Sequence, residues 1–403
     1  MNTTKLPMEV NTCIDEILPE LIAVRHDLHS HPELGYSETR TSKVIQDFLD
    51  SISVQYVSGL AKGTGVLGHI TGDSSKSIGL RADIDALPIF EENSFDWKSN
   101  NEGCMHACGH DGHTTILLGA AKVLSTIAKQ QSLPNPVTFV FQPAEEGGAG
   151  AKYMVEDGCL TGSRIGDPVG TMFGLHGWPQ LPLHSVATRS GPMLAADIGV
   201  EMTIRGTGGH AAFPHFGSDP VLCAAQVVTA VQQLVSRNTD PLDSLVVSLT
   251  QIHGGTTHNI IPDEVKITGT MRYLEQMVGK MAKTRFKEIV ESVAKAHDCV
   301  ASVDLTDGYP VTCNDPDAVE QFFSVARNTI DPSRVSQFDR PVMGGEDFSY
   351  YCKEVPSCFF ALGLLPEGLD TIPDLHQPTF DFNDDAIGTG VKMFCALALN
   401  SSL

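Results

Sequence analysis

The order of apolar and amphipathic stretches along this chain of 403 residues restricts its fold more than any other feature. Over the first 190 residues, and again after residue 308, apolar runs typical of buried strands alternate with patterns typical of helices. Such alternation predicts an α/β sheet covered by helices. Residues 196–307 follow another order, namely strand, helix, strand, strand, helix, strand. This is the order of a split βαβ unit, so we expect one domain to be interrupted by a second one.

Near the N-terminus, apolar residues at helical spacing predict a helix over residues 12–31, which Pro32 ends, and a second helix is expected over 37–49. Two strands, at 63–70 and 77–89, follow with a polar turn between them. The first strand begins with GTGVLG, which matches the GxGxxG pattern of dinucleotide-binding loops. A strand and a turn come after it instead of the helix that would bind a pyrophosphate, so we expect no nucleotide site.

The charge balance excludes several classes of partner. Asp and Glu number 49 against 27 Lys and Arg, which gives a net charge of −22. This charge repels nucleic-acid phosphates and anionic lipid surfaces. The apolar runs are far shorter than the ~20 residues that span a bilayer, and acidic residues interrupt the region where a signal peptide would be apolar. We therefore expect a cytoplasmic protein without a nucleic-acid or membrane partner.

The stretch MHACGHDGH, residues 105–113, concentrates side chains that bind metals. Cys108 offers a thiolate sulfur and His110 an imidazole nitrogen, just before a predicted helix. Taken alone, they could be a buried thiol and a capping histidine. In PAEEGG, Glu145 and Glu146 follow an apolar strand. They would repel each other in a dry crevice unless a cation neutralised them, although a solvated turn would hold them equally well.

Two distant histidines extend this set of donors. His176, in GLHGWP, ends another apolar run, and His376, in DLHQPTF, lies in a loop before the last helix. Either one alone would more often be an ordinary loop or core residue. Together with the cysteine, the histidine and the two glutamates above, they could hold one or two metal ions with an open position for water. The donor set is then sufficient, so four other histidines are expected to pack or form hydrogen bonds: His29, His31, His106 and His113.

A series of motifs spans nearly the whole chain. In chain order they are RHDLHSHPELGYSE, RADIDALP, MHACGHDGH, QPAEEGGAGA, GLHGWP, GGHAAFPH, NIIPDEVKITGTMR, GGEDFSYY and LHQPTF. Together they resemble the amidohydrolase branch of the M20 metallopeptidase family, which includes hippurate hydrolases and N-acyl-amino-acid aminoacylases.

The resemblance implies a fold and a domain plan. The fold class is α/β, with a three-layer catalytic domain of the zinc-aminopeptidase type and an inserted α+β, ferredoxin-like lid. We expect the catalytic domain at residues 1–192 and 308–403, and the lid at residues 193–307. The lid would also join subunits in a homodimer or a higher homo-oligomer.

The resemblance also implies the roles of site residues. The family's metal ligands fall on five residues of this chain: Cys108, His110, Glu146, His176 and His376. They would hold two divalent ions, Zn²⁺ or Mn²⁺, with Co²⁺ or Ni²⁺ as further options, and the cysteine would replace a bridging aspartate of wider relatives. Glu145 falls on the general base. Asp85 would orient a ligand histidine, and Asp83 stands where those wider relatives have a histidine ligand.

The implied reaction is hydrolysis of a small-molecule substrate, hippurate or an N-acetyl amino acid, to a carboxylic acid and a free amino acid. His210 would help to hold the oxyanion and can reach a neighbouring subunit, Asn259 would bind the carboxylate or the amide, and Arg272 would clamp the carboxylate with two hydrogen bonds. Glu346 and Asp347 are expected to line the substrate cleft without a chemical role. Two alternatives stay open: an N-acetyl-diaminopimelate deacetylase, and a binding protein of the same fold without turnover.

Overall fold

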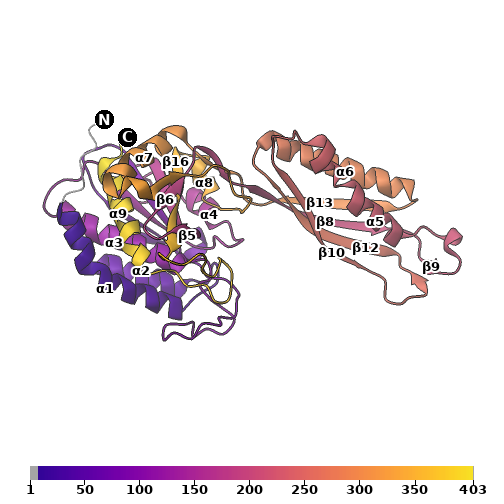
Figure 1. Cartoon of the computed structure of the whole chain (residues 1–403), viewed down its shortest axis with the longest axis horizontal. Coiled ribbons are helices and arrows are strands. Elements are labelled where there is room, and N and C mark those ends of the chain that lie inside the picture. Colours follow the sequence, from indigo (N-terminus) through magenta and orange to yellow (C-terminus); the bar gives the residue numbers. More distant parts are fainter. Residues whose placement is uncertain (1–7, 403) are drawn as a thin grey trace. The chain divides into compact units, whose positions relative to one another are not determined.

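The structure is a computed structural model that describes residues 8–402, and it consists of two compact units (Figure 1). Of the described residues, unit 1 contains 8–193, the segment Cys313–Arg340 and 347–402. Unit 2 contains Leu194–Thr312 and the short segment Pro341–Glu346, which lies outside the lid boundaries expected from the sequence.

Unit 1 is built on one mixed sheet of eight strands. Their order is β1-β2-β4-β3-β5-β16-β6-β15, and β3 runs parallel to β4 and β5, as does β5 to β16. The strands are β1 Gln55–Leu60, β2 Gly65–Ile70, β3 Ser77–Asp83, β4 Val137–Gln142, β5 Val169–Pro182, β6 Val186–Thr188, β15 Val335–Gln337 and β16 Ser357–Leu365. Two short strands at the unit boundaries are β7 Gly191–Leu194 and β14 Thr312–Asn314. As expected, a turn and another strand, with no helix, follow GTGVLG.

Helices cover this sheet and bury its apolar side chains. They are α1 Met8–Ser30, α2 Thr39–Ser51, α3 His110–Ala128, α4 Gly150–Glu156, α7 Pro316–Thr329, α8 Ser349–Cys352 and α9 Asp385–Asn400, with short helical turns η1 Ala61–Gly63 and η4 Pro332–Arg334. The helices α2, α3, α7 and α9 pack on one face, with α1 against α3 and α9, whereas α4 and α8 pack together on the other face. The predicted α/β class with three layers is confirmed.

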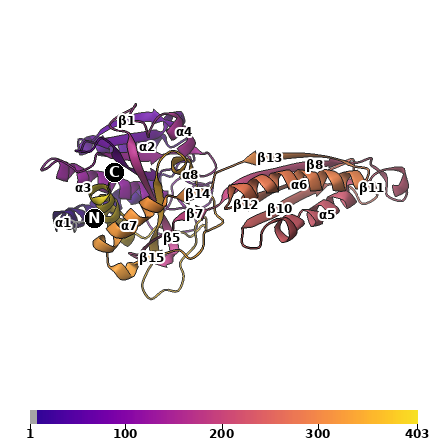
Figure 2. The same ribbon diagram turned by 90° about the horizontal axis from the view of Figure 1, so that it is seen from above.

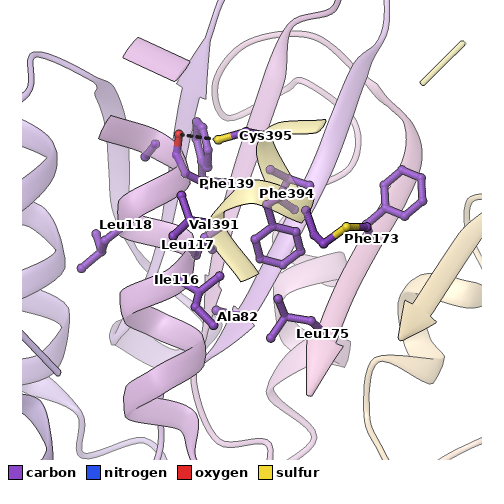
Figure 3. Packing of buried hydrophobic residues seen from close by; sticks show 14 of the residues in the cluster. Ala82, Ile116, Leu117, Leu118, Phe139, Phe173, Leu175, Val391, Phe394 and Cys395 are labelled. Atoms are coloured by element: carbon purple, nitrogen blue, oxygen red, sulfur yellow. Dashed lines mark hydrogen bonds between the residues drawn. The ribbon is translucent and has the colours of Figure 1, made fainter. Parts of the chain in front are cut away.

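The core of unit 1 lies between α3, α9 and the central strands. Figure 3 shows Ile116 and Leu117 of α3 together with Val391 and Phe394 of α9 and Phe173 of β5, and all five are fully buried. Each such side chain contributes about 1.5–3 kcal/mol by leaving water. The sheet packed in this way carries the strand ends at which the candidate site lies.

Unit 2 is a four-stranded antiparallel sheet in the order β10-β12-β8-β13 (Figure 2). Its elements are β8 Ala196–Arg205, β9 Gly209–His210, η2 Pro214–Phe216, α5 Pro220–Ala230, η3 Leu234–Asn238, β10 Leu245–Gly254, β11 Ile260–Ile261, β12 Glu264–Tyr273, α6 Gln276–Ala296 and β13 Val300–Asp307. Alternate residues of β8, such as Ile198 and Val200, are buried in a core formed with α5 and α6, so one face of the sheet is covered. The split βαβ order predicted for this part is confirmed, while its role as a lid stays a prediction.

Local chemistry explains where several helices begin. The Asp219 and Asp315 side chains accept hydrogen bonds from the first-turn N–H groups of α5 and α7, and Pro220 and Pro316 occupy the first helical positions. Both are common start signals for helices. None of the helices in the described part of the chain is long and apolar enough to cross a membrane.

Candidate active site

The candidate site lies where the central parallel strands of unit 1 end. β3 ends at Asp83, which pairs with Gln142, the last residue of β4. Glu145 and Glu146 follow β4 after two residues, and the neighbouring strand β5 carries His176. In sheets of this kind, side chains that follow the carboxyl ends of parallel strands meet in one crevice.

The start of α3 brings two further donors to these strand ends. Gly109 has a φ of 85°, and a Cβ atom at this position would lie 2.9 Å from the ring of Phe382. Only glycine combines this backbone conformation with such a close approach. The turn at Gly109 directs Cys108 and His110, the first residue of the helix, into the buried region.

The five candidate metal ligands come together in groups that share Cys108. The ligand atoms of Cys108, His110 and His176 lie within 4.8 Å of one another, and the same holds for Cys108, Glu146 and His376. The Cys108 Sγ atom is 3.3 Å from His176 Nε2, and His376 Nε2 is 3.2 Å from Glu146 Oε1. Segments that are up to 268 residues apart in the chain, from 108 to 376, thus meet at one place.

Hydrogen bonds from the Nδ1 atoms fix the ring orientation of two of the histidines. The Nδ1 atom of His176 lies 2.8 Å from the Gly177 carbonyl oxygen, and Nδ1 of His110 lies 2.8 Å from the Asp85 carbonyl oxygen. A carbonyl only accepts, so both Nδ1 atoms donate, and Nε2 is the nitrogen of each ring that can bind a metal once it carries no proton. His110 Nε2 is buried without a hydrogen-bond partner, which is the state of a nitrogen arranged to bind a metal.

Charges at the site are arranged for a cation. Burial and the charge of Glu146 raise the pKa of the Cys108 thiol well above its ordinary value. Burial lowers the pKa of His110, but the Asp83 carboxylate outweighs it and the pKa rises to about 10. Burial lowers the pKa of His176. A divalent ion would replace the protons on the thiol and the imidazole, and sulfur, nitrogen and carboxylate donors suit such an ion.

Glu145 lies beside these donors and is itself nearly buried. Its carboxylate is within 4.8 Å of the ligand atoms of His110 and Glu146, and it accepts a hydrogen bond from the Asp347 N–H at 3.4 Å. A carboxylate next to an ion-binding group, held by a backbone N–H, is placed to take up a proton.

A buried ionic network supports the strand ends, and the sequence analysis did not predict it. Arg81 Nη1 lies 2.7 Å from Asp83 and Nη2 lies 2.9 Å from Asp347, while Nε donates to Gln142 at 2.8 Å. Asp347 also accepts from the Ala151 N–H at 2.9 Å. The Asp347 side chain is fully buried, and the expected position of Glu346 and Asp347 along a substrate cleft stays a prediction. The spacing of Arg81 and Asp83 on one face of β3 was the available signal.

Asp85 forms hydrogen bonds with two candidate ligands, while Asp83 and His113 form hydrogen bonds with each other and with the neighbouring backbone. The Gly177 N–H donates to His113 Nε2 at 2.8 Å, so His113 Nδ1 must donate to Asp83, 2.6 Å away. Both ring nitrogens are engaged in hydrogen bonds, which supports the prediction that His113 forms hydrogen bonds instead of binding metal. The Asp85 carboxylate lies 3.2 Å from His110 Nδ1, and it accepts a hydrogen bond from the Glu146 N–H at 2.9 Å.

The three candidate substrate contacts lie in unit 2, in two separate places. His210 pairs with Ile260 between β9 and β11, and the Ala211 N–H donates to the Asn259 carbonyl at 3.0 Å. His210 and Asn259 are therefore neighbours. Arg272 lies near the end of β12, where its guanidinium contacts the Thr270 hydroxyl and the Met271 carbonyl.

Known proteins resemble this chain over nearly its full length. The sequence profile of peptidase family M20/M25/M40 matches residues 79–400. An IAA-amino acid hydrolase (ILR1-like 2) of Arabidopsis thaliana is 40% identical over 388 residues, which cover 95% of this chain and 85% of the plant protein. An N-acetyl-L-cysteine deacetylase of Bacillus subtilis is 39% identical over 370 residues, covering 91% of this chain and 85% of that protein.

A solved structure agrees with these relatives. A Bacillus subtilis protein, described as a dinuclear metal-binding peptidase of family M20, superimposes with a TM-score of 0.81 at 30% identity, covering 96% of this chain and 98% of that one. The amidohydrolase resemblance predicted from the sequence motifs is thereby confirmed. The chain belongs to peptidase family M20/M25/M40.

Proposed function

We propose that this chain hydrolyses the amide bond of N-acyl amino acids and releases a carboxylic acid and a free amino acid. The family makes the chain a hydrolase of amide bonds. The names of two relatives describe hydrolysis of an IAA–amino acid and deacetylation of N-acetyl-L-cysteine, and both substrates carry an acyl group on an amino acid. The observation that carries the proposal is the position of Glu145 beside the His110 and Glu146 ligand atoms.

The donor set fits two divalent ions, and Cys108 belongs to both ligand groups that would hold them. We assign His110, Glu146, His176 and His376 as the other ligands. Zn²⁺ and Mn²⁺ suit these mixed donors, as do Co²⁺ and Ni²⁺. When bound, the ions supply a Lewis acid that polarises the amide carbonyl and lowers the pKa of water.

The protein's own groups handle the proton and the substrate. Glu145 takes the proton from the attacking water at a carboxylate oxygen and returns it to the nitrogen of the leaving amine. The Asp347 N–H keeps that carboxylate in place. His210 donates to the developing oxyanion, Asn259 binds the carboxylate or the amide, and the planar guanidinium of Arg272 forms two hydrogen bonds with the substrate carboxylate.

The first test compares the two adjacent glutamates with a panel of hippurate, N-acetyl amino acids and N-acetyl-diaminopimelate. Glu145→Gln should lower kcat by roughly 10²–10⁴-fold because the base is lost, while the metal content stays at the wild-type value. Glu146→Gln is the matched control, and it should lower the metal content as well as the rate. Chelation should abolish turnover, and readdition of the metal should restore it. A Glu145→Gln enzyme with near-native kcat would contradict the assignment of the base.

The second test concerns recognition of the carboxylate. Arg272→Ala should raise KM for N-acetyl amino acids by roughly 10- to 100-fold, since a charge-assisted pair is lost. The same variant should change little on the corresponding amino acid amides, which lack the carboxylate. Arg205→Ala, which removes an exposed arginine from β8, serves as the control. Equal losses on the acid and the amide would rule out the clamp.

A further inference from the structure

The loop that carries Glu145 and Glu146 begins in a backbone conformation that side chains rarely adopt. Ala144 has a φ of 52°, in the left-handed region, although it is not glycine. Alanine pays a steric penalty there, and such residues persist only where surrounding contacts hold them. Because Ala144 directly precedes Glu145, its backbone angles determine where both glutamates point.

A fully buried carboxylate holds this residue. The Ala144 N–H donates to Glu38 Oε1 at 2.8 Å, and Glu38 Oε2 accepts from the Thr64 hydroxyl at 2.8 Å. Burial raises the pKa of Glu38 to about 7, so a carboxyl group is costly at this position. A neutral apolar side chain would be cheaper unless the hydrogen bonds were needed.

The Glu38 carboxylate does not cap the helix α2 that follows it. Glu38 stands at the N-cap of α2 but forms no side-chain capping bond with that helix. The Glu33 side chain takes this task, because it accepts from the N–H groups of Arg40 at 3.1 Å and Thr41 at 2.8 Å. Glu38 is thus free to turn toward the loop after β4.

Packing restricts Ala144 further. A Cβ atom at Gly35 would lie 3.0 Å from the Ala144 methyl carbon, and one at Gly148 would lie 2.6 Å from it. The methyl group therefore fills the space between two glycines. The Tyr36 hydroxyl also donates to the Gly148 carbonyl at 2.5 Å. The segment from Gly35 to Glu38 contacts the loop both before and after the two glutamates.

We propose that Glu38 is a positioning residue, whose carboxylate holds Ala144 in its left-handed conformation and so aims Glu145 and Glu146 into the site. The proposal rests on the proposed function, since it assigns those two glutamates to proton transfer and metal binding. Without the hydrogen bond, Ala144 relaxes toward negative φ and both glutamates lose their direction.

The test compares Glu38→Ala with Glu38→Gln. Glu38→Ala should lower kcat by roughly tenfold to a hundredfold, as expected for misplacement of a catalytic group by about 1 Å, with KM changed far less. Glu38→Gln keeps an acceptor oxygen for the Ala144 N–H and should keep most of the wild-type kcat. Mn²⁺ titrated into the metal-free proteins should bind more weakly to Glu38→Ala than to wild type or Glu38→Gln.

A second substitution separates positioning from general stability. Glycine adopts positive φ without penalty, so Ala144→Gly should restore part of kcat and of Mn²⁺ affinity when it is added to Glu38→Ala. Should Glu38→Ala fail to fold, Gly35→Ala serves instead, because its methyl group would press on Ala144. The same Ala144→Gly substitution should relieve it.

The control uses the same kind of interaction at a residue that does not precede the two glutamates. Ala61 also has a left-handed φ, 46°, and its N–H donates to the Asp157 carboxylate at 2.7 Å. Asp157→Ala should therefore affect unfolding but leave kcat, KM and Mn²⁺ affinity unchanged. A folded Glu38→Ala protein with wild-type kcat and Mn²⁺ affinity, or a double variant without any recovery, would overturn the proposal. A wild-type protein that is inactive on every N-acyl amino acid would contradict only the proposed function. The Mn²⁺ titrations would still test whether Glu38 positions Glu145 and Glu146.

Discussion

At the residue scale, a cluster of buried charges ties the N-terminal helix to the start of α3. Arg25 Nη1 lies 3.1 Å from Asp111 and 2.8 Å from Asp381, while His29 lies 2.9 Å from Asp111 through Nδ1 and 3.1 Å from Glu91 through Nε2. The Arg25, His29 and Asp111 side chains are fully buried. A buried carboxylate with two cationic partners contributes to stability only while those partners stay charged.

This cluster predicts a specific pH dependence of unfolding. Burial lowers the pKa of His29, but Asp111 outweighs it and raises the pKa from 6.5 to about 9. The stabilisation is complete below pH 6.5 and is lost as the pH rises through about 9, because the folded state holds a proton that the unfolded state has released. The free energy of unfolding of metal-free protein should therefore fall over this range by up to about 3 kcal/mol.

Urea unfolding at pH 6.5 and pH 9 measures this loss. His29→Gln should be less stable at pH 6.5 and should show a flatter dependence on pH. His215→Gln, which alters an exposed histidine in unit 2, should keep the wild-type slope. An unchanged slope in His29→Gln would contradict the role of His29.

The sequence could name the candidate metal donors but not their supports. Cys108 and His110 stand out because thiol and imidazole groups crowd one short stretch. The partners of Glu38 and His113 could not be predicted in this way, because they depend on contacts across the fold. Glu38 and Ala144 each lie in a quoted motif, but the motifs are 106 residues apart at these positions and do not show that the two residues meet.

At the scale of elements, one glycine sets how closely the helices of unit 1 pack. A Cβ atom at Gly119 of α3 would lie 2.7 Å from side-chain carbons of both Leu21 in α1 and Val391 in α9. Gly388 of α9 differs, since the nearest atom to a Cβ there would be Ile14 Cγ2 at 3.8 Å, an ordinary contact distance. The two glycines should respond to a methyl group in opposite ways.

Gly119→Ala should lower the free energy of unfolding by about 1–3 kcal/mol, because the helices must move apart. Gly388→Ala should raise it by about 0.4–1 kcal/mol, because alanine loses less backbone entropy in a helix. Urea unfolding of the two variants and wild type at one pH gives both values. Shifts of the same sign would mean that helix packing does not depend on the close approach at Gly119.

The sequence pattern located elements with one buried face and missed those without one. All six main elements of unit 2 were expected, because strands such as β8 alternate buried and exposed residues. β1 was not expected, since most of its side chains are at least partly exposed and it lies at the edge of the sheet. The strands β6 and β15 have three residues each, which is too short for any period to show.

At the scale of the whole molecule, exposed apolar side chains gather in unit 2. Eleven of the fourteen large apolar residues that are exposed in the described part of the chain belong to it. Phe213, at 54% exposure, and Phe216, at 79%, follow His210 in the sequence, and Ile260, at 54%, pairs with His210 between β11 and β9. Apolar side chains concentrated in one unit favour association between copies, which supports the predicted homo-oligomer.

The positions of the candidate substrate contacts give a second argument for association. Asn259 precedes β12, which begins at Glu264, whereas Arg272 is the last residue but one of that strand. The eight residue steps from Glu264 to Arg272 span about 27 Å at the usual rise of a strand. An N-acyl amino acid is much shorter than this distance. If Arg272 and the His210–Asn259 pair contact one substrate, this spacing along β12 favours contacts that come from two copies of the chain.

Mixing two inactive variants tests this arrangement directly. His210→Ala and Glu145→Gln should each be nearly inactive alone. In a mixed dimer, the subunit with an intact Glu145 would receive the intact His210 of its partner, so one of two sites works. Because half of randomly formed dimers are mixed, the mixture should recover about one quarter of the wild-type activity.

Sedimentation should show a dimer in each sample. The double substitution Phe216→Asp and Ile260→Asp should shift the protein from dimer toward monomer. A dimer whose mixture recovers no activity would place His210 and Glu145 of one chain in the same site.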